Sequence, residues 1–152
     1  MENTHYYDVK VSWTSDRKGT LSSPVLNESF EVATPPEFPG GMEGIWSPEH
    51  LFVASVNSCL MTTFLAISEF SKFEYESFTV DAKGKLEKVD GKFMISEIEL
   101  NPVLEITDAS KESKGLRIIE KAEAACLISN SIKTNIVMTP KIIVREAEVT
   151  TE

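Results

Sequence analysis

The stretch SPEHLFVASVNSCLMTTFLAIS, residues 47–68, decides the fold. Ser47 is a good N-cap, and Pro48 suits the first helical position because its missing N–H would be unpaired there. Glu49 adds negative charge to the first turn, where it favours the helix dipole. From residue 51 to residue 70 apolar side chains fall on every side of the helix, which is typical of a helix buried on all sides. We therefore expect a long, buried central helix.

The segments on either side of this helix predict strands and a second helix. HYYDVKVSW (5–13) and the pieces after it alternate as in a small antiparallel meander, followed by a loop rich in Pro and Gly at 35–46. After the central helix, two alternating stretches flank Asp90-Gly91, a dipeptide that favours a tight hairpin turn. Helical spacing then runs to Cys126, and TNIVMTPKIIV (134–144) predicts a last strand with Pro140 at an edge or bulge. This order indicates an α+β fold with helices packed on antiparallel sheet.

Composition limits the class of protein. A chain of 152 residues is the usual size of one domain, so we expect a single domain over 1–152. A net charge of −9 without a basic stripe argues against nucleic-acid binding. The central apolar run carries polar residues at 57, 58, 62 and 63, which argues against a membrane span, and the N-terminus has no secretory pattern. We expect a cytoplasmic protein without a structural disulfide.

The chain has two cysteines, Cys59 and Cys126, each in or at the end of a predicted helix. A buried cysteine is often a small apolar core residue, and this reading stays open. A reactive thiolate needs nearby positive charge, and Cys59 lies too deep in its helix for the dipole to help. Arg17, in the turn SDRKG, is a candidate cation. No metal site is expected, because no C-x2-C pair is present and the two histidines form no ligand pattern.

Two motifs resemble those of the OsmC/Ohr superfamily. SPEHLFVASVNSCL (47–60) is similar to the first motif, in which Pro-Glu opens a long helix and a cysteine follows ten residues after the glutamate. AEAACLISNSIKTNI (122–136) is similar to the second motif, and SDRKG stands where the family carries its arginine. The resemblance extends from about Tyr6 to Val144. The family usually has proline directly after the second cysteine, where this chain has Leu127.

The resemblance implies a fold, an activity and a site. The fold is OsmC-like, with two layers, antiparallel sheets around a long buried central helix, and an intertwined homodimer. Cys59 is the implied peroxidatic cysteine and Cys126 the resolving one, while Arg17 polarises the thiolate and the peroxide and Glu49 orients Arg17. The implied activity is a thiol-dependent peroxidase that uses no cofactor. It reduces organic hydroperoxides, with hydrogen peroxide as a further candidate, through a Cys59 sulfenic acid and a Cys59–Cys126 disulfide that a thiol or dithiol reductant then opens.

Helix geometry adds a prediction about assembly. Ten residues of helix span about 15 Å, and Glu49 lies about 80 degrees around the axis from Cys59, so one straight helix cannot bring the two together. We expect the arginine and carboxylate to meet the thiol across a symmetric dimer. The alternative function is a non-catalytic module that binds an apolar small molecule at the dimer interface, which Leu127 in place of proline favours.

Overall fold

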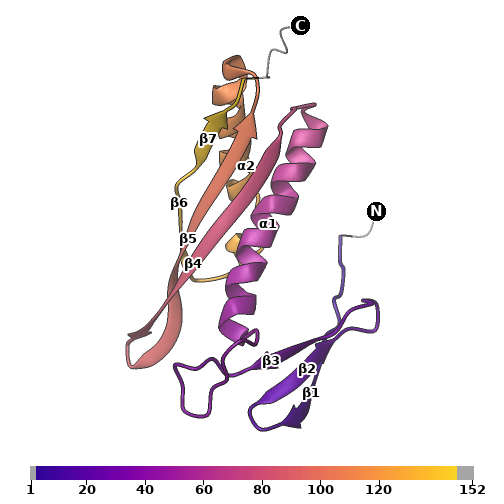
Figure 1. Cartoon of the computed structure of the whole chain (residues 1–152), viewed down its shortest axis with the longest axis vertical. Coiled ribbons are helices and arrows are strands. Elements are labelled where there is room, and N and C mark those ends of the chain that lie inside the picture. Colours follow the sequence, from indigo (N-terminus) through magenta and orange to yellow (C-terminus); the bar gives the residue numbers. More distant parts are fainter. Residues whose placement is uncertain (1–2, 147–152) are drawn as a thin grey trace, which may run out of the picture. The chain divides into compact units, whose positions relative to one another are not determined.

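The computed structural model describes residues 3–146, which divide into two compact units, Met1–Leu51 and Phe52–Glu152. Each unit has its own β-sheet, and the chain is α+β as the sequence predicts (Figure 1).

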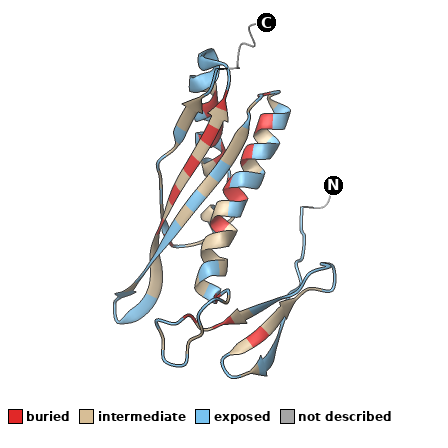
Figure 2. Ribbon diagram, viewed as in Figure 1, coloured by how far each residue is buried: buried red, intermediate tan, exposed pale blue. Residues whose placement is uncertain are grey.

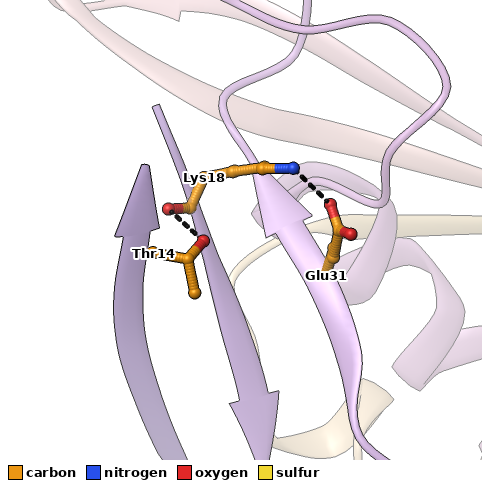
Figure 3. A network of polar contacts seen from close by, with 3 residues as sticks. All are labelled: Thr14, Lys18 and Glu31. Carbon is orange, nitrogen blue, oxygen red and sulfur yellow. Dashed lines mark hydrogen bonds and ion pairs between the residues drawn. The ribbon is translucent and has the colours of Figure 1, made fainter. Parts of the chain in front are cut away.

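The first unit contains the predicted meander. Its strands are β1 (Lys10–Ser15), β2 (Lys18–Ser22) and β3 (Phe30–Ala33), paired antiparallel in the order β1-β2-β3. The Lys18 ammonium lies 3.2 Å from the Glu31 carboxylate on β3, and the Thr14 hydroxyl donates a hydrogen bond to the Lys18 carbonyl (Figure 3). These contacts join side chains of all three strands directly beside the turn that carries Arg17.

The loop between β3 and the helix folds back on itself. The Met42 N–H donates to the Thr34 carbonyl at 2.9 Å, and the Gly41 N–H donates to the Phe38 carbonyl at the same distance. A Cβ on Gly41 would lie 1.9 Å from the Pro35 carbonyl oxygen, so a side chain cannot fit there. The loop that sequence composition predicts is therefore a closely packed segment.

The second unit is built on a long hairpin. Strands β4 (Ser77–Val89) and β5 (Lys92–Ile106) pair antiparallel along their whole length. Asp90 and Gly91 connect them with φ of 51° and 79°, which confirms the predicted turn.

Two short strands complete this sheet on the β5 side. Both β6 (Asn135–Met138) and β7 (Lys141–Val144) pair parallel with β5, so the prediction of a purely antiparallel sheet was wrong at this edge. The physical reason is the crossover, because a helix between β5 and β6 returns the chain to the end from which β5 started. Pro140, which lacks an N–H, lies between these two strands, so the single last strand expected over 134–144 is divided in two.

Both long helices pack on one face of the sheet. They are α1 (Pro48–Phe70) and α2 (Glu112–Ala124), and short 3-10 turns, η1 (Ala109–Lys111) and η2 (Ser129–Ser131), flank α2. Phe78 on β4 is paired with Leu104 on β5, so the two side chains share a face. Phe64 of α1 stacks on Phe78 with ring centroids 3.9 Å apart, and Leu104 approaches Gly115 of α2. The second unit is thus a two-layer arrangement with its core between helices and sheet (Figure 2).

Helix α1 begins where the sequence predicts, with the Ser47 hydroxyl accepting the His50 N–H at 3.1 Å. Its burial differs from the prediction, because one face alone is buried within the chain. Met61 is 40% exposed and Leu65 39% exposed, whereas Phe64 between them is fully buried. The sheet of the second unit covers one face of this helix, and the described residues of that unit leave its other apolar side uncovered. By length and composition α1 could also cross a membrane, a test that core helices of globular proteins pass as well.

Candidate active site

Cys59 lies on the buried face of α1, and 9% of it is exposed. Val56 and Leu60, which share this face, are fully buried. The same periodicity that packs α1 on the sheet therefore turns the Cys59 thiol into the interior of the second unit.

Cys126 follows the end of α2 by two residues and is fully buried. Its N–H donates to the Glu123 carbonyl at 3.1 Å, and its carbonyl accepts the Asn130 N–H at 3.0 Å. The Asn130 side chain also donates to the Ala124 carbonyl at 3.2 Å. These bonds satisfy carbonyls that the helix end leaves unpaired, and they fix the turn in which Cys126 stands.

The fold brings the two thiols together, although they are far apart in the sequence. Both are free cysteines, and each side chain is among the groups that shift the pKa of the other, so the two side chains lie close together. Burial raises the pKa of Cys59, but the hydrogen bonds from Cys126, the Ile128 and Leu127 N–H groups and the Thr63 hydroxyl lower it further than burial raises it. The pKa of the Cys59 thiol is therefore lowered, and no cation of the second unit contributes to this shift.

The pKa of Cys126 moves in the opposite direction. Burial raises it most, and the hydrogen bond that Cys126 gives to the Cys59 sulfur raises it further. The Ser129 side chain and backbone N–H oppose this change without cancelling it. The two shifts in opposite directions mean that Cys59 loses its proton more readily than Cys126.

The N–H of Leu127 belongs to the group of donors that lower the pKa of Cys59. A proline at this position would have no N–H to give. Leucine at this position therefore keeps an N–H that contributes to the lowered pKa of Cys59.

Arg17 and Glu49 belong to the first unit and line the same cavity there. Arg17 stands in the turn between β1 and β2, and its side chain lies over Gly40, where a Cβ would be 2.9 Å from the arginine Nε. The cavity has a volume of about 440 Å³, and Thr34, Pro35, Phe38, Pro39 and Pro48 complete its lining. Within residues 3–146, the buried Glu49 Oε2 has no hydrogen-bond partner. A carboxylate and a guanidinium that share an apolar cavity can bind and polarise a small oxygen-containing group.

Sequence reasoning missed several residues around the thiols. Thr63 could have been found, because it lies four residues after Cys59 on the same helix face, with its Oγ1 4.0 Å from the sulfur. The Ile128 N–H lowers the pKa of Cys59, and Ser129 lowers that of Cys126. Both residues lie in the turn after α2, whose path the sequence does not specify. In the part of the chain that the structure describes, no group of three or more His, Cys, Asp or Glu side chains could hold a metal ion.

The lowered pKa of Cys59 predicts how its reactivity depends on pH. The pH midpoint of Cys59 alkylation should lie below that of an ordinary, exposed cysteine, because the pKa of Cys59 is lowered. Cys126→Ala removes a donor to the sulfur and should move the midpoint upward, and Thr63→Val should move it upward by less. The measurement is iodoacetamide labelling against pH, followed by mass spectrometry of Cys59.

The matched control for this experiment is Thr62→Val on the same helix. The Thr62 hydroxyl donates to the Cys59 carbonyl at 3.2 Å and is not among the groups that shift the pKa of the thiol. The pH midpoint of Cys59 labelling in Thr62→Val should equal that of the unmodified protein. A midpoint that Cys126→Ala leaves unchanged would contradict the assigned contact between the thiols.

Comparison with known proteins identifies the family of this chain. A sequence model of the OsmC-like proteins matches residues 41–141. The uncharacterized protein YmaD of Bacillus subtilis is 28% identical over 137 residues, which cover 87% of this chain and 89% of that protein. An OsmC-like protein of unknown function from Vibrio cholerae has 25% sequence identity and a TM-score of 0.80, with 90% of this chain and 99% of the other covered.

The fold is also that of an organic hydroperoxide resistance protein from Elizabethkingia anophelis, with a TM-score of 0.72, 24% identity, and coverage of 95% of this chain and 100% of the other. The family match covers most of the chain, including Cys59, Cys126 and Glu49. The chain therefore belongs to the OsmC-like family within the OsmC/Ohr superfamily.

Proposed function

We propose that the chain is one OsmC-like domain that acts as a thiol-dependent peroxidase on organic hydroperoxides. The observation that carries this proposal is the contact between two free thiols whose pKa values are shifted in opposite directions, that of Cys59 downward and that of Cys126 upward. Family membership supports it, as does the fold shared with organic hydroperoxide resistance proteins. A cytoplasmic location, where thiol reductants keep cysteines reduced, is part of the proposal.

The reaction begins with the Cys59 thiolate, which attacks the outer oxygen of the hydroperoxide. The O–O bond breaks, the alkoxide leaves and takes a proton to become an alcohol, and Cys59 becomes a sulfenic acid. The Cys126 sulfur then attacks the Cys59 sulfur and displaces the hydroxyl group as water, which leaves a Cys59–Cys126 disulfide. An external thiol or dithiol reduces the disulfide and restores both thiols.

Arg17 is the proposed group that polarises the peroxide and the thiolate, and Glu49 the group that orients Arg17. The shared cavity in the first unit supports these roles, because its apolar lining around one guanidinium and one carboxylate suits an organic hydroperoxide better than a fully polar oxidant.

A homodimer is the proposed assembly, intertwined as the family resemblance implies. The uncovered apolar side of α1 supports it, since Met61, Leu65 and Phe70 are exposed in the single chain, Phe70 at 92%. Exposed apolar residues along a helix of this length mark a surface that another protein surface covers. A second copy is the simplest partner, because a two-fold axis would let the same helix cover itself.

The peroxidase proposal predicts a defined oxidation product. Stopped-flow mixing of the reduced protein with cumene hydroperoxide should give rapid oxidation and a Cys59–Cys126 disulfide by mass spectrometry, faster than with hydrogen peroxide. Cys126→Ser should stop at a sulfenic acid on Cys59 that dimedone traps, and Cys59→Ser should not react. Slow oxidation without the disulfide would overturn the enzyme proposal in favour of a module that binds an apolar small molecule.

Arg17 and the neighbouring Lys18 offer a matched pair of charge deletions. Arg17→Ala should slow sulfenic acid formation by about tenfold or more, because a positioned cation stabilises charge that develops in the transition state. Lys18→Ala removes one positive charge from the residue after Arg17 and breaks the ion pair of Lys18 with Glu31. Sulfenic acid formation in this variant should stay within about twofold of the unmodified rate. Equal rates for the two variants would contradict the role of Arg17.

The dimer predicts a molecular mass near twice 16.9 kDa by light scattering at micromolar concentration. Leu65→Glu places a charge on the uncovered side of α1 and should shift the mass toward the monomer. Glu120→Lys, an exposed charge reversal on α2, is the control and should leave the mass unchanged. A monomeric unmodified protein would contradict the proposed assembly.

A further inference from the structure

One glycine in the loop before α1 lies against the Arg17 side chain. Gly40 has a φ of 80°, a backbone conformation that residues with a side chain rarely adopt. A Cβ at this position would lie 2.9 Å from the Nε, 3.3 Å from the Cγ and 3.4 Å from the Cζ of Arg17. The arginine therefore runs along Gly40 from its aliphatic stem to the guanidinium carbon.

The loop that carries this glycine and the turn that carries Arg17 are tied to one residue, Thr34. The Thr34 N–H donates to the Arg17 carbonyl at 3.4 Å, and the Thr34 carbonyl accepts the Met42 N–H at 2.9 Å. The Trp13 indole N–H donates to the Asp16 carbonyl at 3.0 Å and closes the turn itself. These hydrogen bonds fix the backbones on both sides of the contact, so the space available to the arginine side chain is fixed as well.

The Arg17 side chain has little else to hold it in place. Arg17 is exposed, and within residues 3–146 its guanidinium forms no ion pair, not even with Glu49, which lines the same cavity. An exposed arginine samples many rotamers, and ordering it costs conformational entropy. The contact along Gly40 therefore decides how the guanidinium lies on the cavity wall.

We propose that Gly40 is the positioning residue of Arg17, because the missing side chain at position 40 leaves the space that the arginine occupies. This inference rests on the proposed function and adds to it the residue that fixes the cation of the peroxide step.

A side chain at position 40 would displace the arginine and leave the loop in place. The atoms that its Cβ would meet belong to a flexible side chain and not to the backbone, so the arginine gives way first. Arg17 also lines a second cavity of about 440 Å³, together with Trp13 and Val32, which offers open space to the displaced guanidinium. We therefore expect a loss of position at Arg17 with little further loss of stability.

Gly44 offers a matched control in the same loop. Its φ of 77° imposes a similar strain on an alanine, but a Cβ there meets nothing within 4 Å. Gly40→Ala and Gly44→Ala should therefore lower Tm by similar amounts. Stopped-flow mixing with cumene hydroperoxide, read by dimedone trapping, should show sulfenic acid formation slowed by about tenfold in Gly40→Ala, because a misplaced group loses much of its effect on the reaction. Gly44→Ala should stay within about twofold of the unmodified rate.

Gly40→Asn separates the contact from the backbone strain. Asparagine adopts a positive φ more readily than alanine does, so this variant carries less strain but has the same Cβ. Sulfenic acid formation should be as slow in Gly40→Asn as in Gly40→Ala. The unmodified rate in a folded Gly40→Asn variant would overturn the inference, since it would assign the effect to backbone conformation.

Coupling between the two residues is the readout that a purely structural role would not give. In Arg17→Ala, the further change Gly40→Ala should alter the rate of sulfenic acid formation by no more than about twofold, because the group that the glycine positions is already absent. Arg17→Lys keeps the positive charge on a flexible stem, so Gly40→Ala should slow this variant less than it slows the unmodified protein.

The outcomes distinguish this inference from the proposed function. Equal rates in Gly40→Ala and Gly44→Ala would overturn the inference and leave the peroxidase intact, as would an equal cost of Gly40→Ala with and without Arg17. The unmodified rate in Arg17→Ala would overturn the inference together with the role of Arg17. An unmodified protein that forms no Cys59–Cys126 disulfide would overturn the proposed function itself.

Discussion

The packing of one face of α1 on the β4–β5 sheet is the constraint on which the candidate site depends. Val56, Leu60 and Phe64 are fully buried there, and Cys59 shares their face. Burial by itself makes a thiol less acidic and less reactive. The turn after α2, which packs on the same sheet face, supplies the donors that reverse this effect. The chemistry of Cys59 thus comes from two helices held by one sheet.

Much of the fold is encoded locally and could be predicted. The start of α1 follows from Ser47 and Pro48, and the hairpin turn from Asp90-Gly91, because each signal acts within a few residues. The parallel pairing of β6 and β7 depends on the crossover through α2, which no short pattern reports. The exposure of Met61 was missed for a related reason, since periodicity gives the apolar sides of a helix but not the number of surfaces available to cover them.

The candidate site could be predicted only in part. Cys59 and Cys126 stand in motifs that resemble those of a known family, and in the structure each side chain shifts the pKa of the other. Glu123 and Ser129 carry no such signal, because glutamate near a helix end and serine in a turn are ordinary surface residues. Tertiary packing alone buries Glu123 Oε2 and Ser129 Oγ.

The hydrogen bonds to the Cys59 sulfur also bear on the energetics of reduction. Donors such as the Leu127 N–H stabilise the thiolate, a species that exists in the dithiol form and is lost when the sulfurs join. A disulfide whose reduced form is stabilised has a higher, more oxidising reduction potential. A Cys59–Cys126 bridge would therefore accept electrons from comparatively weak cellular dithiols, and a proline at position 127 would shift the same couple toward stronger electron donors.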